Sequence, residues 1–296
     1  MLNIENIKKS YGNQLVLEDI NLFINKPRLI ALIAPNGSGK TTLLNIICNL
    51  EKADSGVVTV NNIPNNKIEI FEKLSFMQDN SVLYSELTGM DHIELIQAVY
   101  SLNRDRVDQV LSDLNMFDYI SKKVKNYSLG MKQHLLFALA ILPKPDVLLL
   151  DEPLNGLDPA SVVKVRNSLI SLHKKGTTIL FSSHNLEQID KLTNDIYFLK
   201  NGNLISYDEI IKRKESRVFK VITDFPDKLI SYAQTLACEV KVVSRYTCHI
   251  KCSLKQIQKI KKLDTLMIFE VCEIENSLEQ IYFELYKDYD YEPIQI

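Results

Sequence analysis

The segment RLIALIAPNGSGKTTLLN, residues 28 to 45, constrains the fold of this chain more than any other part of its sequence. Its first six residues form a short apolar run that is typical of a buried strand, and the following TTLLNIICNL carries apolar residues at helical spacing. Between them lies a loop that contains Gly37 and Gly39. A glycine-rich loop between a strand and a helix presents backbone amides to a phosphate group, and the helix dipole adds positive potential. The segment therefore predicts an α/β fold that binds a nucleotide.

The loop departs from the usual nucleotide-binding pattern at one position. That pattern is Gly, four residues, then Gly-Lys-Ser/Thr, and here Ala34 replaces the first glycine. If Ala34 needs a positive φ angle, its Cβ costs about 1–2 kcal/mol, but no phosphate-binding side chain is lost. We expect Lys40 to reach the β- and γ-phosphates and Thr41 to ligate Mg²⁺. The residues expected to bind the nucleotide are Asn36, Gly37, Ser38, Gly39, Lys40, Thr41 and Thr42.

A second motif, VLLLDEP (residues 147 to 153), ends an apolar strand in an acidic pair. Strands of this kind deliver a metal-organising carboxylate at their carboxyl end. We expect Asp151 to hold Mg²⁺ through water and Glu152 to act as the general base on the attacking water. An apolar strand that ends in Asp-Glu is common, and its place downstream of a phosphate-binding loop is what makes it informative.

The rest of the chain indicates two domains. Short apolar runs separated by helical stretches predict a mostly parallel sheet covered on both faces, within residues 1–206. Residues 85–142 are mainly helical in periodicity and predict a helical subdomain. Residues 207–296 give the order βαββαβ followed by one more helix, which predicts a small α+β domain of the ferredoxin-like kind.

Composition and charge exclude several classes of protein. A net charge of −2 argues against a nucleic-acid partner. The longest purely apolar run, LLFALAIL, has eight residues, whereas a membrane-spanning helix needs about 20. The start, MLNIENIKKSYG, contains no apolar signal core. The five cysteines show no framework spacing, so we expect reduced thiols in the cytoplasm.

Between the two motifs lies NYSLGMKQ, residues 126 to 133. Ser128 predicts a helix N-cap. In company with the other two motifs, this segment resembles the signature of ATP-binding-cassette (ABC) ATPases, which is usually Leu-Ser-Gly-Gly-Gln. Ser128 and Gly130 keep the family's residues at their positions. YSLGMKQ is similar to the variant found in single-cassette subunits of bacterial antibiotic and peptide exporters.

Further positions fit the same resemblance over about residues 1 to 206. Tyr11, in KSYGNQ, matches the family's aromatic residue that stacks on adenine, and Gln78, in FMQDN, matches a glutamine that senses Mg²⁺ and contacts the membrane partner. Asp158, in LNGLDP, matches the aspartate of the loop after the acidic pair. His184, at the end of TTILFSSH, matches the histidine that senses the γ-phosphate. Taken singly, Tyr11 and His184 would be interpreted as surface groups. Because their order and spacing match the family's motifs, we interpret them as site residues.

The sequence also departs from the family pattern outside the phosphate-binding loop. The signature is altered, and His134 stands where an Arg commonly follows it. Together with Ala34, these differences bear on the rate of turnover and on the affinity between two cassettes, more than on the identity of the family. Every position expected to contact phosphate or metal through its side chain is kept.

The resemblance implies a subunit that hydrolyses ATP with Mg²⁺ at the cytoplasmic face of a bacterial membrane. In the family two cassettes face head to tail, so Ser128 and Gly130 of one close over ATP held by the other. A separate integral-membrane permease carries the substrate, a peptide, antibiotic or other amphipathic molecule, and docks on residues 85–142. The expected catalytic residues are Lys40, Gln78, Glu152 and His184. The expected metal site is formed by Thr41, Gln78 and Asp151, and Tyr11, Ser128, Gly130 and Asp158 complete the nucleotide contacts.

Alternative functions stay open at this point. Translation-factor-like and DNA-repair ATPases use the same cassette, but the former usually joins two cassettes and the latter inserts long coiled coils, and neither pattern occurs here. A non-hydrolysing regulatory cassette is a weaker alternative, against which Glu152 argues.

Two features lie outside the cassette. The segment CHIKC suggests zinc, but on a strand His249 points away from Cys248 and Cys252, so no chelate is expected. Lysines cluster just after it. We interpret them as a solvated helix face. The functional alternative is that they contact lipid headgroups or the membrane partner. They are Lys251, Lys255, Lys259, Lys261 and Lys262.

Overall fold

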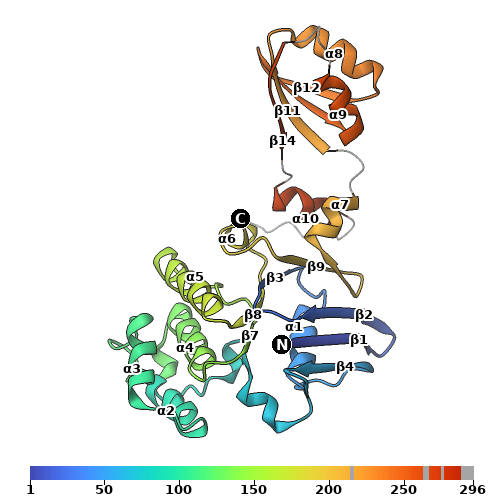
Figure 1. The fold of residues 1–296 in the computed structure, drawn as a ribbon. Helices are drawn as coiled ribbons and strands as arrows, with labels where there is room; N and C mark the ends of the chain where they lie inside the picture. Colours follow the sequence, from blue (N-terminus) through green and yellow to red (C-terminus); the bar gives the residue numbers. More distant parts are fainter. Residues whose placement is uncertain (214–216, 263–266, 275–276, 288–296) are drawn as a thin grey trace. The chain divides into compact units, whose positions relative to one another are not determined.

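The apolar run before the phosphate loop forms β3 (Leu29–Ile33), a buried strand inside a six-stranded sheet (Figure 1). The strand order is β10-β9-β3-β8-β7-β6. All neighbours pair in parallel except β10, which runs antiparallel to β9. The other strands are β6 (Leu74–Met77), β7 (Val147–Leu150), β8 (Thr178–Ser182), β9 (Ile196–Lys200) and β10 (Asn203–Ser206). The central strands β3, β7 and β8 are buried along their whole length, as expected when both faces of a sheet are covered.

The structure is a computed structural model that describes residues 1–213, 217–262, 267–274 and 277–287. The chain divides into two compact units, Met1–Tyr207 and Asp208–Ile296. The mostly parallel sheet predicted for the cassette is confirmed, and it lies in the first unit.

A second sheet of the first unit is antiparallel, with the order β2-β1-β4-β5. Its strands are β1 (Leu2–Tyr11), β2 (Gln14–Ile24), β4 (Ser55–Val60) and β5 (Ile63–Pro64). Strand β2 passes close to the phosphate loop, because a Cβ added at Gly39 would lie 2.7 Å from Cγ1 of Val16.

Helices pack beside these sheets in the first unit (Figure 1). The expected helical region contains α2 (Gly89–Val99), α3 (Arg104–Asp113) and α4 (Leu129–Ile141). Helix α2 starts at a capping box, in which Thr88 and Asp91 exchange hydrogen bonds. The remaining helices are α1 (Lys40–Ile47), α5 (Pro159–Lys174) and α6 (Leu186–Asp190), with short 3₁₀ turns at Ile68–Glu72, Asn80–Val82 and Val124–Asn126.

The second unit follows the order β11-α8-β12-β13-α9-β14, preceded by α7 and followed by α10. Its sheet is antiparallel with the order β12-β13-β11-β14. The elements are α7 (Tyr207–Arg213), β11 (Arg217–Thr223), α8 (Pro226–Thr235), β12 (Glu239–Ser244), β13 (Thr247–Cys252), α9 (Leu254–Lys261), β14 (Ile268–Ile274) and α10 (Leu278–Tyr286). Cys248 and Cys252 are buried in the core of this unit, and His249 alternates to the other face of β13. The assignment of this unit as a ferredoxin-like accessory domain stays a prediction.

None of the helices formed by the described residues combines the length and the apolar character needed to cross a membrane.

Candidate active site

The loop between β3 and α1 adopts a conformation that its two glycines permit. Gly37 has a φ of 76° and Gly39 a φ of 100°, values at which residues with a Cβ are strained. Ala34 is not among the described residues with a positive φ, and its side chain is fully buried. The strain considered for Ala34 is therefore absent, and the alanine fits the loop without a conformational cost.

Lys40 begins α1 and turns its side chain back under the loop. Its Nζ donates hydrogen bonds to the backbone oxygens of Ala34, at 2.7 Å, and Pro35, at 2.9 Å. Burial lowers the pKa of Lys40, whereas the negative charges of Glu152 and Asp151 act in the opposite direction. The cation thus lies close to both carboxylates while bound to loop carbonyls.

Asp151 leaves the carboxyl end of β7 and contacts two hydroxyl groups. Its Oδ2 accepts a hydrogen bond from Thr41 Oγ1 at 2.7 Å, and its Oδ1 accepts one from Ser182 Oγ at 2.5 Å. Ser182 Oγ in turn accepts from the backbone N–H of Glu152 at 2.8 Å. Because Ser182 ends β8, it fixes the orientation of both acidic residues from the neighbouring strand.

Glu152 is held by residues from two further segments. Its Oε2 lies 3.0 Å from Nδ1 of His184, which follows β8. Its backbone oxygen accepts a hydrogen bond from Nε2 of Gln133, in α4, at 2.8 Å. Glu152 has a φ of 49°, an uncommon value for a residue with a side chain. Sequence reasoning did not identify Gln133 or Ser182, because their roles depend on contacts between distant segments.

These groups surround a cavity of about 370 Å³. It is lined by Tyr11, Gln14, Val16, Asn36, Gly37, Gly39, Lys40, Thr41, Thr42, Asp151 and Glu152. Pockets that hold small ligands commonly have about 300–1,000 Å³. Tyr11 lies at its rim with about half of its surface exposed. The fold thus brings most of the predicted nucleotide-binding residues to one place, and adds Gln14 and Val16 from β2.

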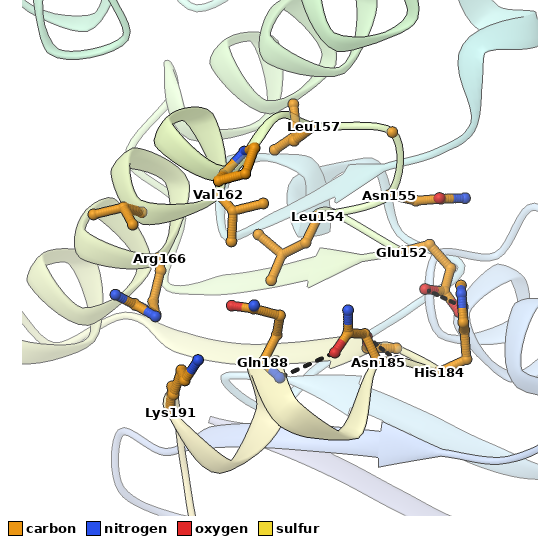
Figure 2. Close-up of a pocket in the computed structure, with 14 residues that line it drawn as sticks. Glu152, Leu154, Asn155, Leu157, Val162, Arg166, His184, Asn185, Gln188 and Lys191 are labelled. Carbon is orange, nitrogen blue, oxygen red and sulfur yellow. Dashed lines mark hydrogen bonds and ion pairs between the residues drawn. The ribbon is translucent and has the colours of Figure 1, made fainter.

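A second cavity, of about 580 Å³, lies between the loop after Glu152, helix α5 and helix α6 (Figure 2). Glu152 and His184 stand at one end of the cavity. Arg166 from α5 and Lys191, which follows α6, line it as well. Glu152 belongs to the walls of both cavities, which therefore meet at this side chain.

The signature-like segment lines neither of these cavities. Ser128 is the N-cap of α4, and its Oγ accepts a hydrogen bond from the N–H of Met131 at 3.2 Å. The side chain of Leu129 lies over Gly156, where an added Cβ would lie 2.7 Å from Leu129 Cγ. Gly130 also lies near that loop, since an added Cβ would be 3.4 Å from the oxygen of Gly156. The segment is thus fixed against the loop after the acidic pair.

Four other predicted residues also lie outside the first cavity, and one of them, His184, lines the second. Ser38 donates a hydrogen bond to the oxygen of Pro35 at 2.8 Å. Asp158 is the N-cap of α5 and accepts hydrogen bonds from the N–H groups of Ala160 and Ser161. Gln78 lines a separate, mainly apolar cavity of about 230 Å³ beside α2 and α4.

His134 is buried in α4, where the family pattern has an arginine. Its Nδ1 lies 3.2 Å from the hydroxyl of Tyr119, and its Nε2 has no hydrogen-bond partner among the described residues. Burial lowers the pKa of His134, the charge of Lys164 lowers it further, and Asp158 opposes both. The ring is therefore neutral at physiological pH.

Comparisons with known proteins match this arrangement. Residues 17–155 match the family described as "ABC transporter". The lantibiotic transport ATP-binding protein SrtF of Streptococcus pyogenes is 33% identical over 205 residues, which cover 69% of this chain and 89% of SrtF. The bacitracin transport ATP-binding protein BcrA of Enterococcus faecalis is 33% identical over 209 residues, covering 69% of this chain and 68% of BcrA. The dimeric post-hydrolysis structure of the ATP-binding cassette MJ0796, bound to ADP and Pi, gives a TM-score of 0.62 at 25% identity over 69% of this chain and 96% of that one.

Proposed function

We propose specific roles for the site residues, starting from the family of the protein. The chain belongs to the ABC transporter family, as an ATP-binding and ATP-hydrolysing subunit. The observation that carries the assignment is the convergence of Lys40, Asp151 and Glu152 on one cavity. In this assignment the cavity holds the triphosphate, the loop amides and Lys40 bind the β- and γ-phosphates, and Tyr11 stacks on the adenine.

Glu152 is the proposed general base. It accepts a proton from water as the water oxygen attacks the γ-phosphorus, and the bond from that phosphorus to the bridging oxygen breaks, so ADP leaves. His184 Nδ1 lies 3.0 Å from Glu152 Oε2, and this contact orients the carboxylate. Ser182 supports the same geometry, because it bonds both the Asp151 carboxylate and the Glu152 N–H.

Thr41 and Asp151 fit a magnesium ion. Their side-chain oxygens lie 2.7 Å apart and are hard oxygen ligands of the type that Mg²⁺ prefers. A bound Mg²⁺ supplies charge neutralisation for the triphosphate. Gln78 completes the predicted set, although it lines another cavity and not the one that holds Thr41 and Asp151.

A second cassette completes the site in this proposal. Ser128 and Gly130 lie away from the cavity of their own chain, at the start of α4, where backbone N–H groups and the helix dipole attract anions. Facing another copy or a related chain head to tail, they would contact the γ-phosphate in trans. The dimeric cassette structures among the neighbours support this arrangement.

A permease is proposed to dock on the mainly apolar cavity beside α2 and α4. Phe71, Val82 and Tyr100 line it, and Leu95 and Val99 add exposed apolar surface on α2. Because Gln78 lines the same cavity, this residue would take part both in docking of the permease and in sensing of Mg²⁺. In this proposal the chain works at the cytoplasmic face of the membrane.

The proposed cargo is an amphipathic peptide or antibiotic that the permease exports. Support comes from the relatives, whose names assign them lantibiotic, bacitracin and linearmycin functions. The second unit, residues 208–296, is proposed to be a ferredoxin-like accessory domain that tunes dimerisation or contacts the permease. A chain that ends near residue 206 should then still bind ATP.

The experiment for the proposed roles compares the unsubstituted protein with Lys40→Ala and with Lys26→Ala, an exposed control. Titration with labelled ATP and Mg²⁺ should give at least about tenfold weaker binding for Lys40→Ala, since hydrogen bonds to charged groups are worth about 1.5–3 kcal/mol. Lys26→Ala should bind normally. Equal and negligible binding by all three proteins would contradict the proposal.

A further inference from the structure

The two cavities of the active site meet at Glu152, the residue beside which the γ-phosphate would be cleaved. The first cavity is the nucleotide site. The second, of about 580 Å³, extends from Glu152 and His184 to the facing surfaces of α5 and α6 (Figure 2). Apart from Glu152 and His184, no residue that lines the second cavity has a role in the function proposed above.

The polar groups of the second cavity suit an inorganic anion. Arg166 extends from α5 into it, on the side away from His184 (Figure 2). Among the described residues, none forms a hydrogen bond or ion pair with the Arg166 guanidinium. Lys191 lies near, and its ammonium is paired with Glu187. Arg166 is therefore the cation of this cavity that is available to a ligand.

Gln188 supplies a second polar group. Its Oε1 is buried and has no hydrogen-bond partner among the described residues, although buried amide oxygens are normally paired. Its backbone N–H donates to Asn185 Oδ1 at 3.1 Å. Gln188 and Arg166 both line this cavity, and an oxygen acceptor together with a cation matches a protonated phosphate, which both donates and accepts hydrogen bonds.

Electrostatics give the direction of movement. Once Glu152 has given up the proton that it accepted during cleavage, its carboxylate repels a phosphate of about 1.5 to 2 negative charges beside it, and Arg166 attracts that phosphate. In the closed dimer proposed above, the partner cassette would cover the first cavity, and a route through the second would let phosphate leave before the two cassettes separate.

We infer that the second cavity is the exit route of inorganic phosphate, and that Arg166 guides phosphate away from Glu152. This inference rests on the proposed function, since it needs ATP cleavage at Glu152. Arg166 takes no part in the cleavage itself. Its loss should slow phosphate release and leave the chemical step unchanged.

The test separates cleavage from release in single turnovers, with the full chain in excess over ATP·Mg²⁺. Quenched-flow sampling measures cleavage, and a fluorescent phosphate-binding protein measures free phosphate in a stopped-flow instrument. Arg166→Ala should cleave ATP at the unsubstituted rate and release phosphate at least about threefold more slowly, an effect that shrinks at high salt because screening weakens charge interactions. Arg166→Lys should restore most of the release rate. Lys174→Ala, an exposed cation of the same helix, should behave as the unsubstituted protein.

The outcomes are distinguishable. Phosphate release that keeps pace with cleavage in Arg166→Ala, or that is slowed equally by Lys174→Ala, would overturn the exit route and leave the proposed function intact. A lack of cleavage by the unsubstituted protein would overturn the proposed function, and the exit route with it.

Discussion

Thr41 and Asp151 share a hydrogen bond of 2.7 Å although 110 residues separate them in the sequence. The contact joins the start of α1 to the end of β7. Both oxygens are proposed metal ligands, and the fold itself brings them together. Thr41 and Asp151 would hold a Mg²⁺ ion there, and the ion would supply charge neutralisation for the triphosphate.

Asp151→Asn should weaken Mg²⁺-dependent nucleotide binding at least about tenfold, because the amide keeps the shape but removes the negative charge that favours the cation. Nucleotide binding without metal should change little. Titration of ATP at fixed and at zero Mg²⁺ measures both. Asp113→Asn, at the end of α3, is the control, and an equal loss in both variants would argue against a metal role for Asp151.

Glu152→Gln should keep ATP binding and lose about 10²–10⁴-fold in hydrolysis, the usual effect of removing a general base. With ATP uncleaved, the closed dimer should persist and appear as a larger species by light scattering in ATP but not in ADP. Ser128→Arg in the same background should remove that species by blocking the contact in trans.

The matched control for Glu152→Gln is Glu94→Gln, an exposed position of α2. Its hydrolysis rate should equal that of the unsubstituted protein. If Glu152→Gln itself hydrolyses ATP at the normal rate, another group activates the water and the proposed mechanism is wrong.

Gly156→Ala should destabilise the protein by more than backbone strain alone. Gly156 has a φ of 72°, and an added Cβ would overlap the side chain of Leu129. Gly176→Ala is a control with positive φ and open space around it, so it carries only the strain of about 1–2 kcal/mol. Urea denaturation should place Gly156→Ala below Gly176→Ala in stability.

The Leu129→Ala background tests the cause of that difference. There, the overlap disappears, and the cost of Gly156→Ala should fall to that of Gly176→Ala. An unchanged cost in the double variant would show that Leu129 is not the contact that matters.

His134 predicts a pH dependence of stability. Burial lowers the pKa of His134 below its usual 6.5, so the unfolded chain binds more protons than the folded one in this range. The stability contributed by neutral His134 is complete above about pH 6.5, the usual pKa that holds in the unfolded chain, and is lost as the pH falls from there through the lower pKa of the folded protein. Urea midpoints at pH 7.5 and 5.5 should differ less in His134→Gln than in the unsubstituted protein. An identical pH dependence in both would refute the assignment.

Local patterns predicted the parts of the site that lie next to one another in sequence. The loop from Asn36 to Thr42 and the pair Asp151–Glu152 were identifiable because their strand and helix contexts are readable from apolar spacing. The parallel sheet followed from the same spacing. Tyr11 and His184 were assigned to the site only because their order along the chain matches that of the family's motifs.

Contacts between distant segments were not predictable in this way. The hydrogen bond from Gln133 to the Glu152 oxygen depends on how α4 packs against the loop after β7. Strand β1 and most of β2 alternate with irregularities in their register, which blur the period-2 pattern. The second cavity is likewise a property of packing between α5 and α6, which no short motif records.

The two carbonyls that hold Lys40 have a consequence for how nucleotide is recognised. The Lys40 ammonium has two oxygen partners within its own loop, those of Ala34 and Pro35, so its burial does not leave a bare charge. In the role proposed for Lys40, binding of a triphosphate would be an exchange of partners, in which phosphate oxygens take the place of these peptide oxygens. A ligand would then have to offer the ammonium more negative charge than two peptide groups do, which a neutral nucleoside cannot.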